Sequence, residues 1–193
     1  MTEDEILQTF RKHSALLEGH FILSSGLHSD LYIQCALVLQ HPPVAEQLCS
    51  ELAAKLRYLR ASAVAAPALG GVIVAHEVAR ALGARAVFTE RQDGVMALRR
   101  GFSFAAAEPI IVVEDVMTTG GSTRETITCV EQAGGRVVGV GALVDRSDGE
   151  TRWDLPSAAL LNLDVRNYEP ADCPLCKKGT PATKPGSRPL PPP

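Results

Sequence analysis

Apolar residues follow two patterns along this chain, one typical of helices and one typical of buried strands. Residues 2–17 and 44–59 place their large apolar side chains three or four positions apart, on one face of a helix. Between these stretches, residues 18–34 alternate only in part and are interrupted by Ser-Ser-Gly. This pattern predicts two short strands joined by a polar turn.

From residue 63 onward, short runs of apolar and often β-branched residues alternate with amphipathic stretches. The predicted strands are 63–66, 84–89, 110–113, 137–144 and 158–163, and the predicted helices are 72–82 and 123–133. Gly83 is a natural stop for the first of these helices. Residues 90–108 form a charged, glycine-containing excursion. The alternation predicts an α/β fold in which helices flank a central, mostly parallel sheet.

The length of the chain, 193 residues, suits one domain with a sizeable core. We expect this domain to span residues 1–176. The remaining residues, 177–193, contain six prolines together with lysine, glycine and serine, and they lack apolar periodicity. This composition predicts a disordered or loosely packed tail.

Composition and charge narrow the class of protein. Hydrophobic residues make up 46% of the chain and charged residues 21%, as in ordinary soluble globular proteins. A net charge of −3 argues against nucleic acid as the main partner. No stretch approaches the roughly 18 apolar residues of a membrane span, and the acidic N-terminus lacks the plan of a signal peptide. We therefore expect a cytoplasmic protein that binds neither nucleic acid nor a membrane.

Five cysteines with scattered spacing argue against a disulfide framework. Only Cys173 and Cys176 have the spacing of metal ligands. A structural zinc site needs four ligands, and no second pair of cysteines or histidines lies nearby in the sequence. We therefore interpret the pair as two thiols in a C-terminal turn. A half-site completed across a dimer axis and a redox pair are the alternatives.

The richest candidate site lies at the end of the predicted strand 110–113. Glu114 and Asp115 follow this strand, and a loop of hydroxyl residues and glycines then enters a helix. Backbone N–H groups and the helix dipole at such an N-terminus bind an anion, while carboxylates can accept hydrogen bonds from sugar hydroxyls. The loop lacks the Gly-Lys-Ser/Thr of a Walker A loop and the Gly-x-Gly-x-x-Gly of a dinucleotide site. It therefore predicts a site for a sugar phosphate.

A second loop, 67–71, enters a helix in the same way and predicts a second anion site.

The order acid, acid, apolar, apolar, Thr-Thr-Gly-Gly-Ser-Thr at 114–123 resembles the phosphoribosyl-diphosphate (PRPP) signature of the type I phosphoribosyltransferases. The resemblance continues in order over roughly residues 5–170. It implies that Glu114 and Asp115 hold the ribose hydroxyls and act in catalysis, that residues 118–122 hold the 5′-phosphate, and that loop 67–71 receives the diphosphate. The PRPP-binding residues implied in this way are Glu114, Asp115, Val116, Met117, Thr118, Thr119, Gly120, Gly121, Ser122, Ala68, Leu69, Gly70, Arg91 and Arg99.

Residues 89–102 resemble the mobile catalytic loop of the same family. A diphosphate leaving group gains negative charge as its bond to the ribose breaks, and guanidinium groups can bind it bidentately. The candidates are Arg91, Arg99 and Arg100, of which Arg91 and Arg100 are assigned to catalysis. Many relatives have lysines and a histidine in this loop, and a lysine where this chain has Leu69.

The segment 21–32 resembles the N-terminal hood of those family members that use orotate, and we expect the hood to be formed largely by residues 18–40. The resemblance assigns orotate binding to Thr118, Arg146, Ser25 and Gly26. An arginine fork suits the carboxylate of orotate. The implied reaction transfers phosphoribose from PRPP to orotate in UMP biosynthesis and yields orotidine 5′-monophosphate and diphosphate. Mg²⁺ is expected to be held through PRPP and water, without a direct protein ligand. A homodimer is implied as well, because the mobile loop of the family reaches the neighbouring site.

Two alternatives differ from this interpretation. A phosphoribosyltransferase for a purine or for uracil keeps the chemistry and changes the base, and the hood and Arg146 argue against it. A regulator that senses PRPP binds the ligand without catalysis, and the absence of lysines from residues 90–102 keeps it open. Neither the net charge nor the length of the chain offers such a regulator a nucleic-acid-binding face.

Overall fold

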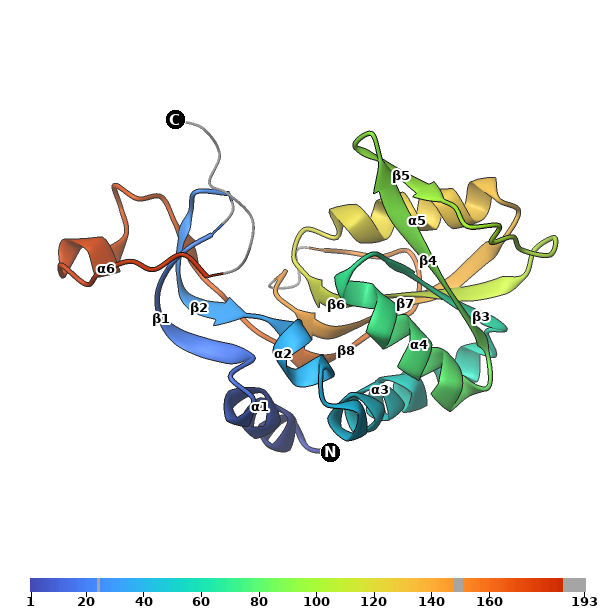
Figure 1. The fold of residues 1–193 in the computed structure, drawn as a ribbon, viewed down its shortest axis with the longest axis horizontal. Helices are drawn as coiled ribbons and strands as arrows, with labels where there is room; N and C mark the ends of the chain where they lie inside the picture. Colours follow the sequence, from blue (N-terminus) through green and yellow to red (C-terminus); the bar gives the residue numbers. More distant parts are fainter. Residues whose placement is uncertain (24, 148–150, 186–193) are drawn as a thin grey trace.

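The computed structural model of this chain contains a six-stranded sheet flanked by helices and a smaller three-stranded sheet beside it (Figure 1). The structure describes residues 1–23, 25–147 and 151–185. The strands are β1 (Leu16–Ile22), β2 (His28–Ile33), β3 (Ala63–Pro67), β4 (Arg85–Gln92), β5 (Val95–Leu98), β6 (Pro109–Met117), β7 (Arg136–Asp145), β8 (Ser157–Asn162) and β9 (Asn167–Tyr168). The helices are α1 (Glu3–Lys12), α2 (Cys35–Leu39), α3 (Pro42–Leu56), η1 (Arg57–Leu59), α4 (Gly70–Leu82), α5 (Gly121–Gln132) and α6 (Pro174–Lys177).

The large sheet has the strand order β5-β4-β3-β6-β7-β8, and all its pairs are parallel except β4 with β5. Helices α3 and α4 cover one face of the sheet and α5 covers the other (Figure 1). Side chains of β6 alternate between the two layers, so that Ile111 and Val113 join the core under α3 and α4, whereas Ile110 and Val112 join the core under α5. This arrangement confirms the predicted α/β fold with a mostly parallel sheet.

The parallel pairing places the two predicted anion loops at one edge of the sheet. Strand β3 pairs with β6 in parallel, with Ala63 opposite Ile110 and Ala65 opposite Val112. The carboxyl ends of parallel neighbours lie on the same side of the sheet, and ligands bind there in open α/β folds. The loop after β3 and the loop after β6 therefore face the same region.

Several element boundaries differ from the sequence predictions. The first helix ends at Lys12 rather than at residue 17, because Ser14 has a left-handed backbone (φ 54°) and the chain then enters β1. Strand β6 continues to Met117, so Glu114 and Asp115 lie within the strand, near its end, rather than after it. Much of the predicted excursion 90–108 is a β-hairpin, since β4 extends to Gln92 and pairs with β5. Helices α2 and α6 and strand β9 were not predicted.

The small sheet has the order β1-β2-β9 and corresponds to the expected hood. Its two main strands confirm the hairpin predicted for residues 18–34, while β9 adds a strand from the far end of the chain. Part of the segment predicted as a loosely packed tail also lies against this sheet, because Thr183 forms a parallel bridge with Phe21. The part of that predicted tail at 186–193 lies outside the described residues. In the described part of the chain, no helix is long and apolar enough to cross a membrane.

Candidate active site

The two adjacent carboxylates at the end of β6 form the centre of the candidate site. The hydroxyl of Thr123, in the first turn of α5, donates a hydrogen bond to Glu114 Oε2. Burial raises the pKa of Glu114 to about 7, and burial also raises the pKa of Asp115. Neither carboxyl group forms an ion pair with a described residue, as expected for groups that receive hydrogen bonds from a ligand.

The loop after β3 approaches the same carboxylates closely. A methyl group at Gly70 would lie 2.5 Å from Asp115 Oδ2, so that only glycine leaves the aspartate its position. Leu69, the preceding residue, projects into solvent with 87% of its surface exposed. The structure thus brings Gly70 and Asp115 together, as the sequence prediction of one joint site requires.

Both helices that start at this edge begin without a side-chain cap from the described part of the chain. Neither Leu69, the N-cap of α4, nor Gly120, the N-cap of α5, caps its helix through a side-chain hydrogen bond to any described residue. Uncapped helix starts with a positive dipole end are suited to anions. Gly120 has a φ of 73° and lies under Trp153, where a methyl group would come within 3.0 Å of the indole ring. The phosphate-type loop is therefore shaped by a position that demands glycine.

Two adjoining pockets open at the loop 118–122. The first, of about 360 Å³, is lined by Arg91, Glu114, Thr118, Thr119, Gly120, Gly121, Ser122, Arg124 and Glu125. The second, of about 460 Å³, is lined by Thr118, Thr119, Arg124, Arg146, Ser147, Thr151, Asp164, Val165 and Asn167. The pockets share the two threonines and Arg124, so the loop forms a wall common to both.

Arg146 is one of two arginines that line the second pocket, and unlike Arg124 it does not line the first. It follows the end of β7, and its backbone N–H donates to the carbonyl of Met117 at 2.8 Å. Burial lowers the pKa of its guanidinium group, and its Nε is buried without a hydrogen-bond partner among the described residues. A buried donor without a partner is costly, which indicates that a ligand acceptor completes this site.

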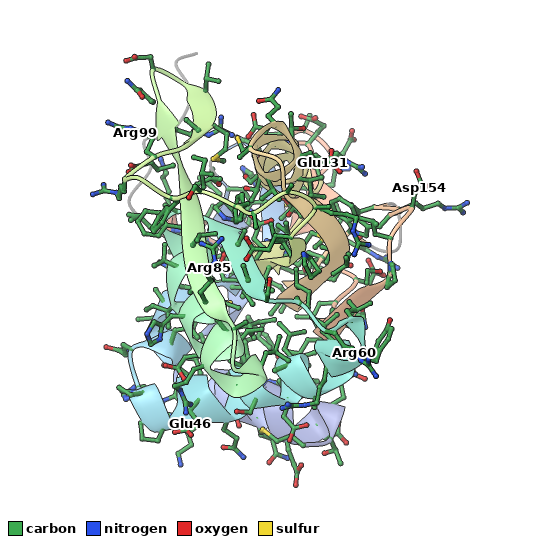
Figure 2. The ribbon with its side chains drawn as sticks, turned by 90° about the vertical axis from the view of Figure 1, so that its right-hand side faces the viewer. Glu46, Arg60, Arg85, Arg99, Glu131 and Asp154 are labelled. Carbon is green, nitrogen blue, oxygen red and sulfur yellow. The ribbon has the colours of Figure 1, made fainter. Side chains whose placement is uncertain are left out.

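The three arginines of the β4–β5 hairpin are placed differently. Arg91 lines the first pocket and forms an ion pair with Glu125 of α5. Arg99 and Arg100 instead pair with Glu90, at 3.5 Å and 3.0 Å, and neither lines the two pockets described above. Figure 2 shows Arg99 at the hairpin end of the molecule, opposite the end that carries Glu46. Only one of the three predicted guanidinium groups thus faces the site in this structure.

The residues that line the pockets differ in part from those predicted from the sequence: two predicted residues lie elsewhere, and several lining residues were not predicted. Ser25 and Gly26, predicted to bind orotate, lie in the turn between β1 and β2 and are not among the residues that line the two pockets. Asn167 of β9 does line the second pocket, and it brings the small sheet to the site. No local motif marks this asparagine, because its position depends on strand pairing with β2. Arg124 and Glu125 follow the PRPP-type motif directly, so their position just after the motif, near the start of α5, was the available signal.

The raised pKa of Glu114 predicts a specific dependence of stability on pH. Between pH 4.5 and about 7 the unfolded chain releases a proton that the ligand-free folded protein retains. The free energy of unfolding therefore falls as the pH rises through this window, and the whole loss is present above it. Replacement Glu114→Gln removes this loss, and we expect the variant to be more stable than the wild type at pH 8 by up to about 3 kcal/mol. Chemical denaturation without ligands at pH 4.5 and pH 8 measures the difference.

The exposed Glu131 of α5 supplies the control for this experiment, since Glu131→Gln removes a charge at the surface. We expect that variant to show the same pH dependence as the wild type. A stability gain for Glu114→Gln that is equal at both pH values would contradict the burial of its carboxylate.

The close approach of Gly70 to Asp115 predicts a second effect. Replacement Gly70→Ala displaces the aspartate, and we expect a fall of about 100-fold in kcat/KM with PRPP, because misplacement of a reacting group by about 1 Å has effects of this size. Ile73→Ala, on the exposed side of the same helix, is expected to leave kcat/KM unchanged. Steady-state kinetics of both variants test the expectation, and equal activity of Gly70→Ala and wild type would refute it.

Comparison with known proteins agrees with this geometry. Residues 38–173 match the phosphoribosyl transferase domain family. The chain is 56% identical to the orotate phosphoribosyltransferase of Pelotomaculum thermopropionicum, over 97% of this chain and 99% of that protein. It is 55% identical to the orotate phosphoribosyltransferase of Heliobacterium modesticaldum, over 97% of this chain and 100% of that protein. The crystal structure of orotate phosphoribosyltransferase from Aeropyrum pernix has 27% identity and a TM-score of 0.66, and it covers 82% of this chain and 93% of that one.

The chain therefore belongs to the family of the type I phosphoribosyltransferases. Within this family it belongs with the orotate phosphoribosyltransferases, with which it aligns over nearly its whole length. The resemblance inferred from the PRPP-type motif is confirmed.

Proposed function

We propose that this protein transfers phosphoribose from PRPP to orotate and releases orotidine 5′-monophosphate and diphosphate, as a step of UMP biosynthesis. One observation carries the proposal: two pockets share the wall of loop 118–122, one next to the carboxylate of Glu114 and the other next to Arg146. The reaction needs one pocket for a sugar phosphate and an adjoining pocket for a base that bears a carboxylate. The reacting carbon of the ribose would then lie at the wall between the two pockets.

The loop and the acids supply the PRPP half of the site. The loop from Thr118 to Gly120 and the first residues of α5, Gly121 and Ser122, bind the 5′-phosphate through backbone N–H and hydroxyl groups. Glu114 and Asp115 accept hydrogen bonds from the 2′- and 3′-hydroxyls and stabilise positive charge on the ribose while the bond from C1′ to the diphosphate oxygen breaks. The start of α4, with Ala68, Leu69 and Gly70, receives the diphosphate, and the N–H groups of Leu69 and Gly70 are the donors because the N–H of Ala68 donates to the carbonyl of Thr89.

Arginines of the hairpin stabilise the leaving diphosphate in this proposal. Arg91 already borders the first pocket, and its side chain and that of Glu125 are both nearly half exposed. Exposed ion pairs contribute little free energy, so Arg91 can exchange its carboxylate partner for a diphosphate at small cost. The same holds for Arg99 and Arg100, whose side chains are about half exposed, if the hairpin bends toward the pocket.

Arg146 and Thr118 orient the base. The guanidinium fork binds the orotate carboxylate bidentately, and its Nε, which has no hydrogen-bond partner among the described residues, supplies one of the two parallel donors. Thr118 lines both pockets and can donate to an orotate carbonyl at the shared wall. Ser25 and Gly26 belong to the hood and would reach the base only when the hood closes over it. The ring nitrogen of orotate then bonds to C1′ as the bond from C1′ to the diphosphate oxygen breaks, and the proton on that nitrogen passes to water.

The proposal further includes Mg²⁺ as the cofactor, a homodimer as the assembly, a cytoplasmic location and a single domain over residues 1–176. The donors around the first pocket are carboxylate, hydroxyl and backbone groups, which suit a hard cation that prefers oxygen. We expect the ion to be bound mainly by PRPP and water, beside Glu114 and Asp115. When bound, it neutralises charge on the diphosphate. The exposed hairpin β4–β5 is the element that would reach a neighbouring subunit.

A panel of bases tests the proposal. Purified protein is incubated with PRPP, Mg²⁺ and one of orotate, uracil, adenine or hypoxanthine, and the nucleotide formed is separated by chromatography. We expect product with orotate at a kcat/KM at least about 100-fold above that with the other bases, because Arg146 needs a carboxylate partner. Product with a purine alone would contradict the assignment of the base. Tight PRPP binding without any product would indicate a PRPP-sensing regulator.

A further inference from the structure

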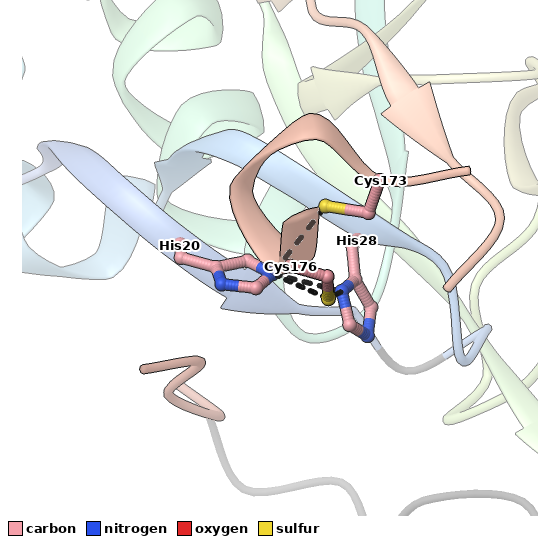
Figure 3. Close-up of side chains that lie close together, drawn as sticks. All are labelled: His20, His28, Cys173 and Cys176. Carbon is pink, nitrogen blue, oxygen red and sulfur yellow. Dashed lines mark hydrogen bonds between the residues drawn. The ribbon is translucent and has the colours of Figure 1, made fainter. Parts of the chain in front are cut away.

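Four possible metal ligands meet outside the two pockets of the proposed active site. They are His20 on β1, His28 on β2, Cys173 just before α6 and Cys176 within it (Figure 3). Their ligand atoms all lie within 4.8 Å of one another. The two histidines and Cys173 are buried, whereas Cys176 is exposed.

The distances between these atoms resemble the edges of a tetrahedron around a metal ion. The Nε2 atom of His20 lies 3.5 Å from the Cys173 sulfur and 3.7 Å from the Cys176 sulfur, and the Nδ1 atom of His28 lies 3.2 Å from the Cys176 sulfur. Zinc bonds of about 2.1 Å to nitrogen and about 2.3 Å to sulfur place tetrahedral ligand atoms about 3.4–3.8 Å apart. The two imidazole nitrogens, at 2.8 Å, would have to separate by about 0.6 Å, and the Cys176 sulfur and His28 Nδ1, at 3.2 Å, by a smaller distance.

Strand pairing explains why two histidines eight residues apart come together. Ile22 lies opposite His28 in the antiparallel pair of β1 and β2. His20 precedes Ile22 by two residues, in the stretch between Glu18 and Phe21 where the strand register shifts, and its Nε2 atom lies 2.8 Å from Nδ1 of His28. The sequence shows only the spacing of the cysteines, and the second pair of ligands appears when the hairpin folds.

The cysteines are presented by a single helical turn. Cys173 is the N-cap of α6, Pro174 occupies the first helical position, and the N–H of Lys177 donates to the carbonyl of Cys173 at 3.1 Å. This turn points both sulfur atoms at the histidines (Figure 3).

A neighbouring carbonyl selects the state of His20 that binds a metal. The Nδ1 atom of His20 lies 2.8 Å from the carbonyl oxygen of Thr180, and because a carbonyl only accepts, Nδ1 carries the proton. Nε2 then presents its lone pair to the centre of the cluster. Outer hydrogen bonds of this type orient histidine ligands in metalloproteins.

We propose that His20, His28, Cys173 and Cys176 bind one structural Zn²⁺ ion that ties the C-terminal segment to the β1–β2 hairpin. Two imidazoles and two thiolates are a preferred zinc set, and four protein ligands leave no open position for a substrate or water, so the role is structural. The site is distinct from the Mg²⁺ expected with PRPP, whose ligands are oxygen atoms, and it does not depend on the proposed activity.

The zinc ion would fasten a part of the chain that has few other attachments. Downstream of α6, Thr183 donates its N–H to the carbonyl of His20 and accepts from the N–H of Ile22, both at 2.8 Å. These two bonds, the contact of His20 Nδ1 with the Thr180 carbonyl, the hydrogen bond from the Thr183 hydroxyl to the His20 carbonyl and the zinc ligands join residues 173–183 to the hairpin. Removal of the ion should release this segment and loosen the hood while leaving the large sheet intact.

Metal analysis of the purified full-length chain, kept reduced and dialysed against micromolar ZnCl₂ and then against buffer, tests the proposal. We expect about one zinc per chain in the wild type and less than about a tenth of that in Cys176→Ser and in His28→Gln. The matched controls are Cys129→Ser on α5 and His76→Gln on α4, which lie outside the cluster and should retain about one zinc each. Replacement of zinc by Co²⁺ should give the visible bands of tetrahedral cobalt with thiolate ligands.

Hydrogen exchange gives a second measurement that does not depend on the variants. A chelator should speed exchange at the amides of Ile22 and Thr183 and leave those of β6 unchanged. Reduced wild-type protein that takes up no zinc would overturn the proposal, and so would zinc binding that survives both Cys176→Ser and His28→Gln. A Cys173–Cys176 disulfide together with no uptake after reduction would identify a redox pair instead.

Discussion

Replacement Asp115→Asn is expected to lower kcat for the transfer from PRPP to orotate by about 100- to 1000-fold. The amide keeps the shape of the side chain but removes the negative charge that, in the proposed mechanism, faces the ribose as its bond to the diphosphate breaks. Loss of one such preorganised electrostatic group has effects of this size. Steady-state kinetics at saturating PRPP and Mg²⁺ measure the change, and the same variant should not lose thermal stability, because burial raises the pKa of Asp115 and so disfavours its ionised form.

The control for Asp115→Asn is the same replacement at Asp154, an exposed residue that projects from the surface in Figure 2. We expect Asp154→Asn to retain wild-type kcat. An Asp115→Asn enzyme within about threefold of the wild type would contradict a role for this carboxylate in the reaction.

Replacement Arg146→Gln is expected to lower kcat/KM for orotate by about 100-fold or more while the KM for PRPP changes little. Removal of one partner from a buried charge pair costs several kcal/mol, since the orotate carboxylate loses its guanidinium and stays desolvated. Arg146→Lys keeps the charge and loses the fork, and we expect a smaller fall of about tenfold. Varying orotate at fixed PRPP, and then PRPP at fixed orotate, separates the two halves of the site.

Arg136, at the other end of strand β7 and exposed, provides the matched control for Arg146. Arg136→Lys and Arg136→Gln should leave both kinetic constants unchanged. If Arg146→Gln raised the KM for PRPP as much as that for orotate, the division of the site into a sugar half and a base half would be wrong.

The fold was largely predictable from the sequence because its signals are local. Apolar β-branched runs such as 110–113 mark buried strands, Gly83 adopts the left-handed conformation expected at a helix end, and the alternation of elements implies parallel strands. The helix predicted for 2–17 was too long, since Leu16 and Leu17 fit the helical period and the strand equally well. The left-handed turn at Ser14 decides between them.

The candidate site was predictable only where its residues are close in sequence. Glu114, Asp115 and the loop that follows form one continuous motif, and parallel strands bring Gly70 beside them. Asn167 reaches the second pocket through pairing of β9 with β2, which no local pattern encodes. His20 and His28, which lie beside Cys173 and Cys176, were not predicted for the same reason. A second pair was expected close in sequence, whereas the β1–β2 hairpin supplies it from the other end of the chain.

The most direct test of the central claim is the loss of orotate absorbance in a mixture of the purified protein, PRPP and Mg²⁺. The account predicts that the absorbance falls in proportion to the protein added, with orotidine 5′-monophosphate formed in equal amount, and that Asp115→Asn protein prepared in the same way is slower by at least about 100-fold. Unchanged absorbance with wild-type protein that binds PRPP, or equal rates for the wild type and Asp115→Asn, would contradict it.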